Sequence, residues 1–374
     1  MDAYLLDTDM LAQLVERLRL EGEVIGPQID RGVIAYGPLK SFEDLPQGWS
    51  ELQGPGLYRL QRTGRPSRFA YRVAPTSWKP FLYPPKELLF RARKEGDSFT
   101  VQPAETSLEA RVLFGLRPCE LRALRVQERV LSKANYPPYQ QRLQASWIVA
   151  VACVEPGENC FCADLDSGPE VRDDCDLKLV EWGDEPRYLA QAGSERGRAL
   201  LRGLALPTAS AEDQKEAQAA LARARRQMGR SLDRRQTPDL LTRKHAHPAF
   251  DALAERCTAC GNCTLVCPTC FCSNLEDHTS LDGREASRYR VWDSCFTLDF
   301  SYIHGGHARS KPSERYRQWM THKLSSWQSQ FDEAGCVGCG RCITWCPEGI
   351  DLTEEFRALT ERAKESTIQY RELT

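Results

Sequence analysis

The chain has 374 residues, with 50 Lys and Arg against 52 Asp and Glu, so its formal net charge is −2. This balance excludes the basic excess that nucleic-acid binding requires. The longest apolar stretch, residues 147–154, is far shorter than the roughly 20 residues that cross a bilayer. We therefore expect two or three domains, no nucleic acid and no direct membrane insertion.

The first ten residues are acidic where a secretory signal would be basic, because they carry Asp2, Asp7 and Asp9 and no apolar segment follows. Sixteen cysteines in such a chain are typical of metal ligands in a reducing cytosol, not of a disulfide framework. We expect a cytoplasmic protein that is sensitive to oxygen.

The front section, residues 1–240, is predicted to be a mixed α/β domain. Apolar residues at helical spacing over 11–18 predict an opening helix, and short β-type runs follow at 32–36 and 69–73. Ser210 and Asp213 are placed as a capping pair for a long, solvated helix over 210–228.

A strand–helix–strand unit lies within this front section. Residues 110–115 are predicted to form a buried strand, residues 120–131 a helix and residues 146–152 a second buried strand, which gives a parallel crossover. Cys119 and Cys153 stand at the carboxyl ends of the two strands, where ligand sites of open α/β sheets form.

Four cysteines of the front section are candidates for one metal cluster. The crossover brings the first two together, and the other two follow the second strand directly. They are Cys119, Cys153, Cys160 and Cys162. Ordinary buried thiols are the alternative, because free cysteine is among the most buried residue types.

The rear section, residues 241–374, contains the spacing C-x2-C-x2-C-x3-C-P twice. In proteins with two such runs, the fourth cysteine of each run ligates the cluster of the other. The first cluster is expected to use Cys257, Cys260, Cys263 and Cys346, and the second Cys336, Cys339, Cys342 and Cys267. Zinc is disfavoured, since zinc sites usually separate their ligand pairs by a dozen or more residues.

The 68 residues between Cys267 and Cys336 exceed what a minimal ferredoxin needs, so a helical insertion is expected at 273–330. The overall fold class is then α+β: a mixed α/β domain followed by a bacterial-type two-[4Fe–4S] ferredoxin domain with an insertion.

Four cysteines remain outside these sets. Cys270, Cys272 and Cys295 form a weaker group that lacks a fourth partner unless His278, His304 or His307 supplies one, and packing thiols near the clusters are the alternative. Cys175, between two aspartates, is expected to be structural.

Several motifs resemble those of one family. These are the segments 114–120, 153–162, 257–272, 292–295 and 336–342, which read FGLRPCE, CVEPGENCFC, CTACGNCTLVCPTCFC, WDSC and CVGCGRC. The chain is similar to the iron–sulfur β subunit of cytosolic sulfhydrogenases, which are NAD(P)-linked [NiFe]-hydrogenases, and also to an iron–sulfur subunit of anaerobic sulfite reductase.

The resemblance implies a non-catalytic electron-transfer subunit. Its partners would be the [NiFe]-hydrogenase subunits, or a siroheme subunit, together with a flavin- and NAD(P)-binding subunit. It favours a third [4Fe–4S] cluster at Cys119, Cys153, Cys160 and Cys162, and suggests more than packing for Cys270, Cys272 and Cys295 without naming a role.

Three questions stay open at this point. The sequence does not separate hydrogenase from sulfite reductase, and it gives no direction of electron flow. A flavin- or deazaflavin-binding dehydrogenase is a further alternative, as is a structural or sensing role for the metal.

Overall fold

The computed structural model describes residues 2–72 and 75–360. Its front part is built on a mixed seven-stranded sheet. In spatial order the strands are β1 (Ala3–Leu6), β11 (Arg187–Ala192), β10 (Leu177–Trp182), β9 (Ser146–Val151), β8 (Arg111–Leu116), β2 (Glu23–Asp30) and β3 (Val33–Pro38). The central strands β2, β8, β9 and β10 pair in parallel, and the outer pairs are antiparallel.

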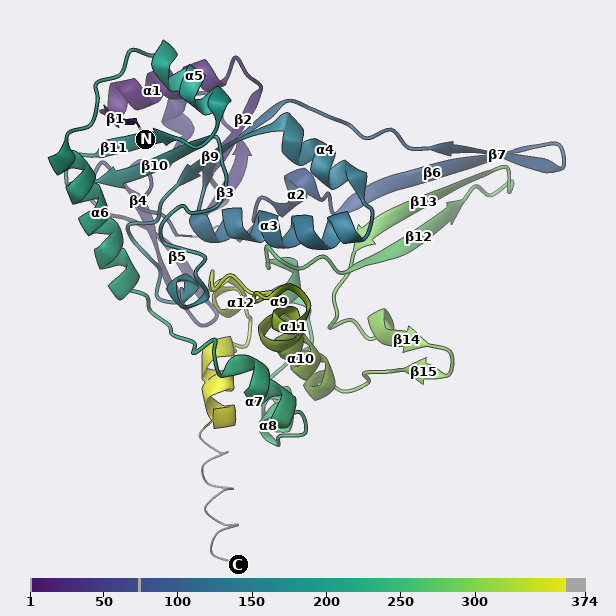
Figure 1. Ribbon diagram of the computed structural model, residues 1–374. Helices are drawn as coiled ribbons and strands as arrows, with labels where there is room; N and C mark the ends of the chain where they lie inside the picture. The colour runs from purple at the N-terminus through teal and green to yellow at the C-terminus, as the bar shows by residue number, and fades with distance from the viewer. Residues whose placement is uncertain (1, 73–74, 361–374) are drawn as a thin grey trace, which may run out of the picture.

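Helices cover both faces of this sheet (Figure 1). On one face lie α1 (Thr8–Leu18) and α5 (Glu195–Gly203), and on the other α3 (Pro118–Lys133), α4 (Pro137–Ala145) and α6 (Ala211–Arg226). The strands alternate accordingly: Val112 and Phe114 of β8 join the core under α1, whereas Leu113 joins the core under α3. The sheet is thus the middle layer of a three-layer sandwich.

The predicted crossover is confirmed. Strands β8 and β9 pair in parallel with Val112 opposite Trp147, and α3 connects them through α4. The opening helix α1 and the long helix α6 with its Ser210–Asp213 capping box are also present. The run at 69–73 is different, because residues 69–72 form no strand and instead lie buried beside β8.

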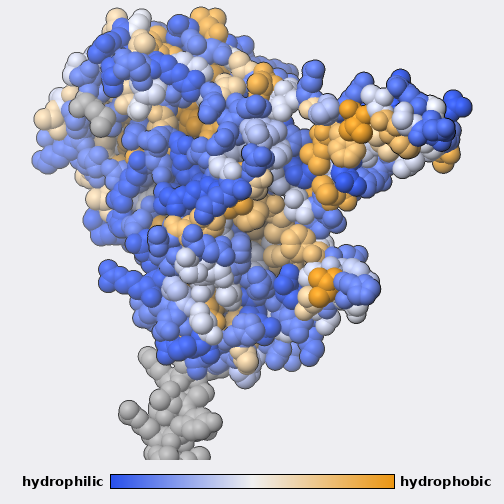
Figure 2. Space-filling view, turned by 45° about the vertical axis from the view of Figure 1, so that its right-hand side comes forward, coloured by the Kyte–Doolittle hydropathy of each residue, from blue (hydrophilic) through white to orange (hydrophobic). Residues whose placement is uncertain are grey.

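A second, four-stranded sheet projects from the body as an arm (Figure 1). Its order is β12 (Ser273–Thr279), β13 (Glu285–Trp292), β6 (Lys86–Glu95) and β7 (Ser98–Pro103). Figure 2 shows apolar side chains gathered along this arm, among them Phe99, Val101 and Leu275, which are more than half exposed. The insertion therefore begins with a β-hairpin that pairs with the front of the chain, and only its second half is helical.

The rear part is made of short helices around a third core. They are α7 (Thr237–Arg243), α8 (Ala249–Ala254), α9 (Asn262–Leu265), α10 (Pro312–Thr321), α11 (Trp327–Phe331) and α12 (Arg341–Thr344). A π-helical turn, η4 (His322–Ser326), joins α10 to α11. Leu240 lies within α7 and packs in this rear core, so the chain has no linker at residue 240.

The remaining elements are small. They are α2 (Lys79–Leu82), the hairpin of β4 (Trp49–Gly54) and β5 (Leu57–Arg62), the hairpin of β14 (Tyr302–Ile303) and β15 (Gly306–His307), and the 3-10 turns η1 (Phe42–Asp44), η2 (Cys162–Leu165) and η3 (Asp299–Ser301). Tyr58 of β5 stacks on Trp345 with ring centroids 4.9 Å apart, so the β4–β5 hairpin connects the front part to the rear part. Within the described residues, no helix is long and apolar enough to cross a membrane.

Candidate metal centres

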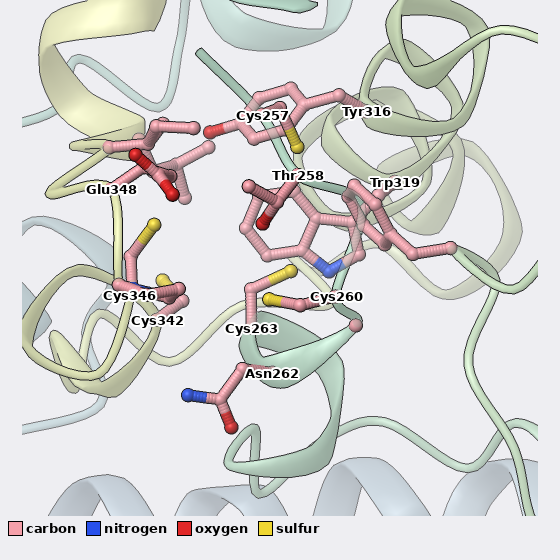
Figure 3. Close-up of a pocket in the computed structure, with 15 residues that line it drawn as sticks. Cys257, Thr258, Cys260, Asn262, Cys263, Tyr316, Trp319, Cys342, Cys346 and Glu348 are labelled. Carbon is pink, nitrogen blue, oxygen red and sulfur yellow. The ribbon is translucent and has the colours of Figure 1, made fainter.

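The first cysteine group surrounds a cavity of about 430 Å³ in the rear part. Cys257 follows α8, Cys260 precedes the turn at Gly261, and Cys263 lies in α9. Figure 3 shows these thiols and that of Cys346 pointing toward one common space. Gly261 has a φ of +75°, and a Cβ there would come within 2.8 Å of the Ser294 hydroxyl. The turn that presents the cysteines therefore needs a glycine.

Cys346 belongs to the second run in the sequence, yet it lies with the cysteines of the first run. Its charge is close enough to affect the thiols of Cys257 and Cys263. Burial, followed by the neighbouring cysteines, raises the pKa of Cys263 well above the usual range. Such a site stays neutral until a positive centre is bound, and a bound metal ion deprotonates its thiol ligands.

The second group gathers Cys336, Cys339, Cys342 and Cys267, each within electrostatic reach of the others. The Gly338 amide donates to the Cys336 sulfur over 3.4 Å. Burial raises the pKa of Cys336 to about 12.

Cys267 behaves differently from the other thiols of the second group. Its pKa lies well below the usual range, because Cys270 donates a hydrogen bond to it, with Lys323 and Thr269 adding to the effect. Its sulfur is 3.2 Å from the Thr269 hydroxyl. The second group is therefore the one with a fixed positive charge beside a thiol.

The third group lies where the front sheet meets the second run. Cys119 occupies the first turn of α3, Cys153 follows β9, and Cys160 and Cys162 lie in the next loop. Burial raises the pKa of Cys160 to about 12 and that of Cys119 well above its usual range, with further contributions from neighbouring cysteines. Cys119 and Cys162 pack with Cys339 of the second group in one small apolar cluster.

Close backbone approach makes this contact feasible. A Cβ on Gly338 would come within 2.7 Å of the backbone of Phe161 and Cys162, and one on Gly340 within 2.5 Å of the Asn159 carbonyl. The Phe161 amide donates to the Gly338 carbonyl over 2.9 Å. The second ferredoxin loop thus lies directly against the loop that carries Cys160 and Cys162.

Arginines hold the carboxyl ends of the front strands. The Arg117 guanidinium, 1% exposed, donates to the carbonyls of Ala152, Phe69 and Tyr71 over 3.1, 2.6 and 2.5 Å. Its positive charge, with that of Arg72, opposes the effect of burial on the pKa of Cys153, which burial still raises. The loop that precedes α3 therefore sets both the backbone and the field around the third group.

A buried ion pair connects the front part to the rear part. Glu120 in α3 pairs with Arg341 in α12, and the two side chains are 1% and 0% exposed. The same carboxylate accepts hydrogen bonds from the Tyr36 hydroxyl (2.6 Å) and the Trp78 indole (3.2 Å). Sequence patterns did not indicate this hub, because its partners are distant in the chain.

The remaining group, Cys270, Cys272 and Cys295, lines a separate cavity of about 620 Å³. None of the expected histidines reaches it: His278 lies on the exposed strand β12, and His304 and His307 lie at the β14–β15 hairpin. His322 lines the cavity instead. The sequence could have indicated it only through the insertion's return to the cysteines, since His322 stands in no cysteine motif.

The donors suit iron–sulfur clusters better than a single ion. In residues 2–72 and 75–360, no three His, Cys, Asp or Glu side chains are close enough together to hold one metal ion. Instead, thiols surround a hollow in the first group and converge from separate loops in the second and third. The assignment of individual ligands stays a prediction.

Comparison with known proteins gives two matches. Residues 256–350 match the model of a family described as a 4Fe-4S dicluster domain. The chain is also 28% identical over 363 residues to "Sulfhydrogenase 2 subunit beta" of Pyrococcus furiosus, covering 94% of this chain and 97% of that protein. No solved structure matches the chain. The rear part is therefore an iron–sulfur dicluster domain, and along nearly its entire length the chain resembles a sulfhydrogenase β subunit.

Proposed function

We propose that the chain is the electron-transfer subunit of a cytosolic, sulfhydrogenase-type [NiFe]-hydrogenase. It relays electrons between the catalytic subunits and a flavin- and NAD(P)-binding subunit. The observation that carries this proposal is the serial contact of three cysteine groups. Cys339 of the second group packs on Cys119 and Cys162 of the third, and Cys342 of the second group lines the cavity of the first.

In this proposal each group holds one [4Fe–4S] cluster. Cluster one is ligated by Cys257, Cys260, Cys263 and Cys346, cluster two by Cys336, Cys339, Cys342 and Cys267, and cluster three by Cys119, Cys153, Cys160 and Cys162. Two arguments support it: the thiols of each set lie within electrostatic reach of one another, and cubane clusters in proteins are held by cysteine thiolates. Cluster two then lies between the other two.

The two ends of the relay differ in exposure. Cys260 is exposed at the first group, whereas Cys119, Cys160 and Cys162 are buried at the third. Reduction potentials of such clusters depend on solvent exposure and on hydrogen bonds to the sulfurs. Cluster one is thus the terminal that is directly open to a partner protein.

The domain division belongs to the same proposal. We place the front domain and the dicluster domain on either side of the segment that precedes α7, slightly before residue 240. Leu240 and Leu241 support this placement, since both pack in the rear core with Phe250 and Trp319.

Anaerobic co-purification with metal analysis tests the function. The tagged chain is isolated without oxygen from its natural source, and the complex is analysed for iron, nickel, siroheme and flavin. We expect about twelve irons in this chain, nickel in the complex and flavin on a separate subunit. Siroheme in place of nickel would assign the chain to a sulfite reductase, and a flavin retained by the isolated chain would make it a dehydrogenase subunit.

A further inference from the structure

The cavity beside the clusters combines apolar walls with cationic groups and thiols. Phe271, Phe300 and Trp319 form the apolar part, and Arg309 and Lys323 contribute positive charge. Arg309 is half-buried, and its Nε has no hydrogen-bond partner among the described residues. A buried guanidinium nitrogen without a partner is costly, and an anionic group entering the cavity would satisfy it.

Two of the three cysteines on the wall form a contacting pair. The Cys295 thiol donates a hydrogen bond to the Cys272 sulfur, which places the two sulfurs next to each other. This hydrogen bond, with Lys323 and Lys79, lowers the pKa of Cys272 to about 7, whereas it raises the pKa of Cys295 above the usual range. One member is poised as a thiolate and the other as a thiol, which is the polarity of a nucleophilic and a resolving cysteine.

Two buried lysines support this polarity. Lys323 is 2% exposed and donates to the Thr269 hydroxyl over 2.6 Å. Lys79 is 4% exposed, donates to the Cys270 carbonyl over 3.2 Å, and lies 3.8 Å above the Trp292 ring. Because buried cations are expensive, two of them around one set of thiols indicate a site where negative charge develops.

The π-helical turn η4 presents the charged wall. His322 and Lys323 are adjacent in sequence, and adjacent residues of a regular α-helix point in directions about 100° apart. Here both line the cavity. Single π turns inside α-helices are frequent at functional sites. His322 accepts a hydrogen bond from the Trp327 indole over 3.0 Å, which fixes its ring.

The cavity adjoins both rear cysteine groups. Cys270 donates a hydrogen bond to Cys267 of the second group, and Trp319 lines this cavity as well as the cavity of the first group. Electrons in either rear cluster would therefore lie one side chain away from the thiol pair.

We propose that Cys272 and Cys295 are a redox-active dithiol that uses electrons from the clusters to reduce a small, anionic, partly aromatic or apolar disulfide bound in this cavity. The inference rests on the proposed function, because the relay supplies the reductant.

The chemistry balances in three steps. The Cys272 thiolate attacks one sulfur of the substrate R–S–S–R, forms a mixed disulfide and releases one thiolate, which takes a proton from solvent. The Cys295 thiol gives up its proton and attacks the Cys272 sulfur, which forms the Cys272–Cys295 disulfide and releases the second thiol. Two electrons from reduced clusters and two protons then restore the dithiol, so one disulfide, two electrons and two protons yield two thiols.

The test uses the anaerobic, cluster-containing full-length chain and 5,5′-dithiobis(2-nitrobenzoate), an anionic aromatic disulfide. Clusters are reduced with dithionite, excess reductant is removed, and the probe is added while thionitrobenzoate release and the paramagnetic signal of the reduced clusters are followed. We expect two thionitrobenzoates per two electrons lost from the clusters. Mass spectrometry after acid quenching and alkylation should find the Cys272–Cys295 linkage once the clusters are exhausted.

Cys272→Ser should slow probe-driven cluster oxidation at least tenfold while its iron and sulfide contents stay those of the wild type. Cys175→Ala, a buried cysteine far from the cavity, should behave as wild type. Equal oxidation rates in Cys272→Ser and wild type would overturn the inference, and so would loss of about four irons in Cys272→Ser, because the cysteine would then be a cluster ligand. Failure of the relay is distinguishable, since wild-type protein would then lack a reducible cluster signal before any probe is added.

Discussion

The rear cysteine groups and the front group reach similar surroundings by different routes. The rear thiols come from two short runs whose glycines at positive φ, Gly261 and Gly340, begin the helices α9 and α12. The front thiols come from a helix start and two loops that meet only because β8 and β9 are neighbours in the sheet. A local motif therefore specifies the rear sites, whereas the tertiary fold specifies the front one.

The same comparison separates the sites by their dependence on the rest of the molecule. The first rear cavity opens toward solvent with Cys260 exposed, and the front group is enclosed by the sheet and by the second run. Damage to the front sheet should consequently remove the front cluster first, while damage to a single rear cysteine should stay local.

The largest expected effect comes from Cys346→Ala. Because Cys346 lies with the first run, this substitution should remove about four irons and the signal of cluster one, and leave the cluster held by Cys336, Cys339 and Cys342. Iron and sulfide analysis with low-temperature paramagnetic resonance measures the loss. Cys175→Ala is the matched control with full iron content. Selective loss of cluster two would show that the two runs do not cross.

A second substitution probes the front site. Cys119→Ala should lower the iron content by about four while both rear clusters remain reducible, because Cys119 contacts Cys162 but belongs to no rear set. The same iron analysis and resonance spectra apply. Unchanged iron content would reduce the front group to packing thiols, the reading that the sequence also allowed.

These substitutions follow the boundary of what the sequence could predict. The rear sets were readable because a cluster needs closely spaced thiols, and the structure places Cys346 and Cys267 in the crossed positions. The crossover of β8, α3 and β9 was readable because its strands are continuous apolar runs.

Other features depend on contacts between distant segments, and no local pattern carries those. The β-hairpin of the insertion was not foreseen, because β12 is almost wholly exposed and pairs through β13 with β6, some 190 residues earlier in the chain. His322 and Lys323 were missed for the same reason: a π turn, not a motif, directs both toward the cysteines.

Arg341→Met tests the link between the two regions. Removing one member of a fully buried ion pair leaves Glu120 unpaired, which typically costs about 3–5 kcal/mol. The melting temperature of the anaerobic protein should fall by about 5–10 °C in a calorimetric scan. Arg243→Met removes an exposed pair with Asp239, both 68% exposed, and should change the free energy of unfolding by less than about 1 kcal/mol. Equal shifts in the two variants would mean that the buried pair does not join the regions.

Glu51→Gln should have a smaller, pH-dependent effect. Burial raises the pKa of Glu51 to about 7, against 4.5 for an unperturbed carboxyl. The folded state then binds more protons than the unfolded state between these values, so stability is greatest below pH 4.5 and is lost as pH rises toward 7. Between pH 6 and 8 the wild type should lose about 1 kcal/mol that Glu51→Gln does not lose. Melting curves across this range measure the difference, and the exposed variant Glu212→Gln should follow the wild type; a Glu51→Gln curve parallel to it would refute the assignment.

The projecting arm has a consequence for how the chain is made. Strands β6 and β7 leave the ribosome early, but the strand that completes their sheet, β13, lies about 190 residues later. Until then the nascent hairpin exposes the unpaired edge of β6 together with Phe99 and Val101. Such late, non-local pairing is slow and favours aggregation. Co-translational chaperone binding near residues 86–103 would shield this edge during synthesis.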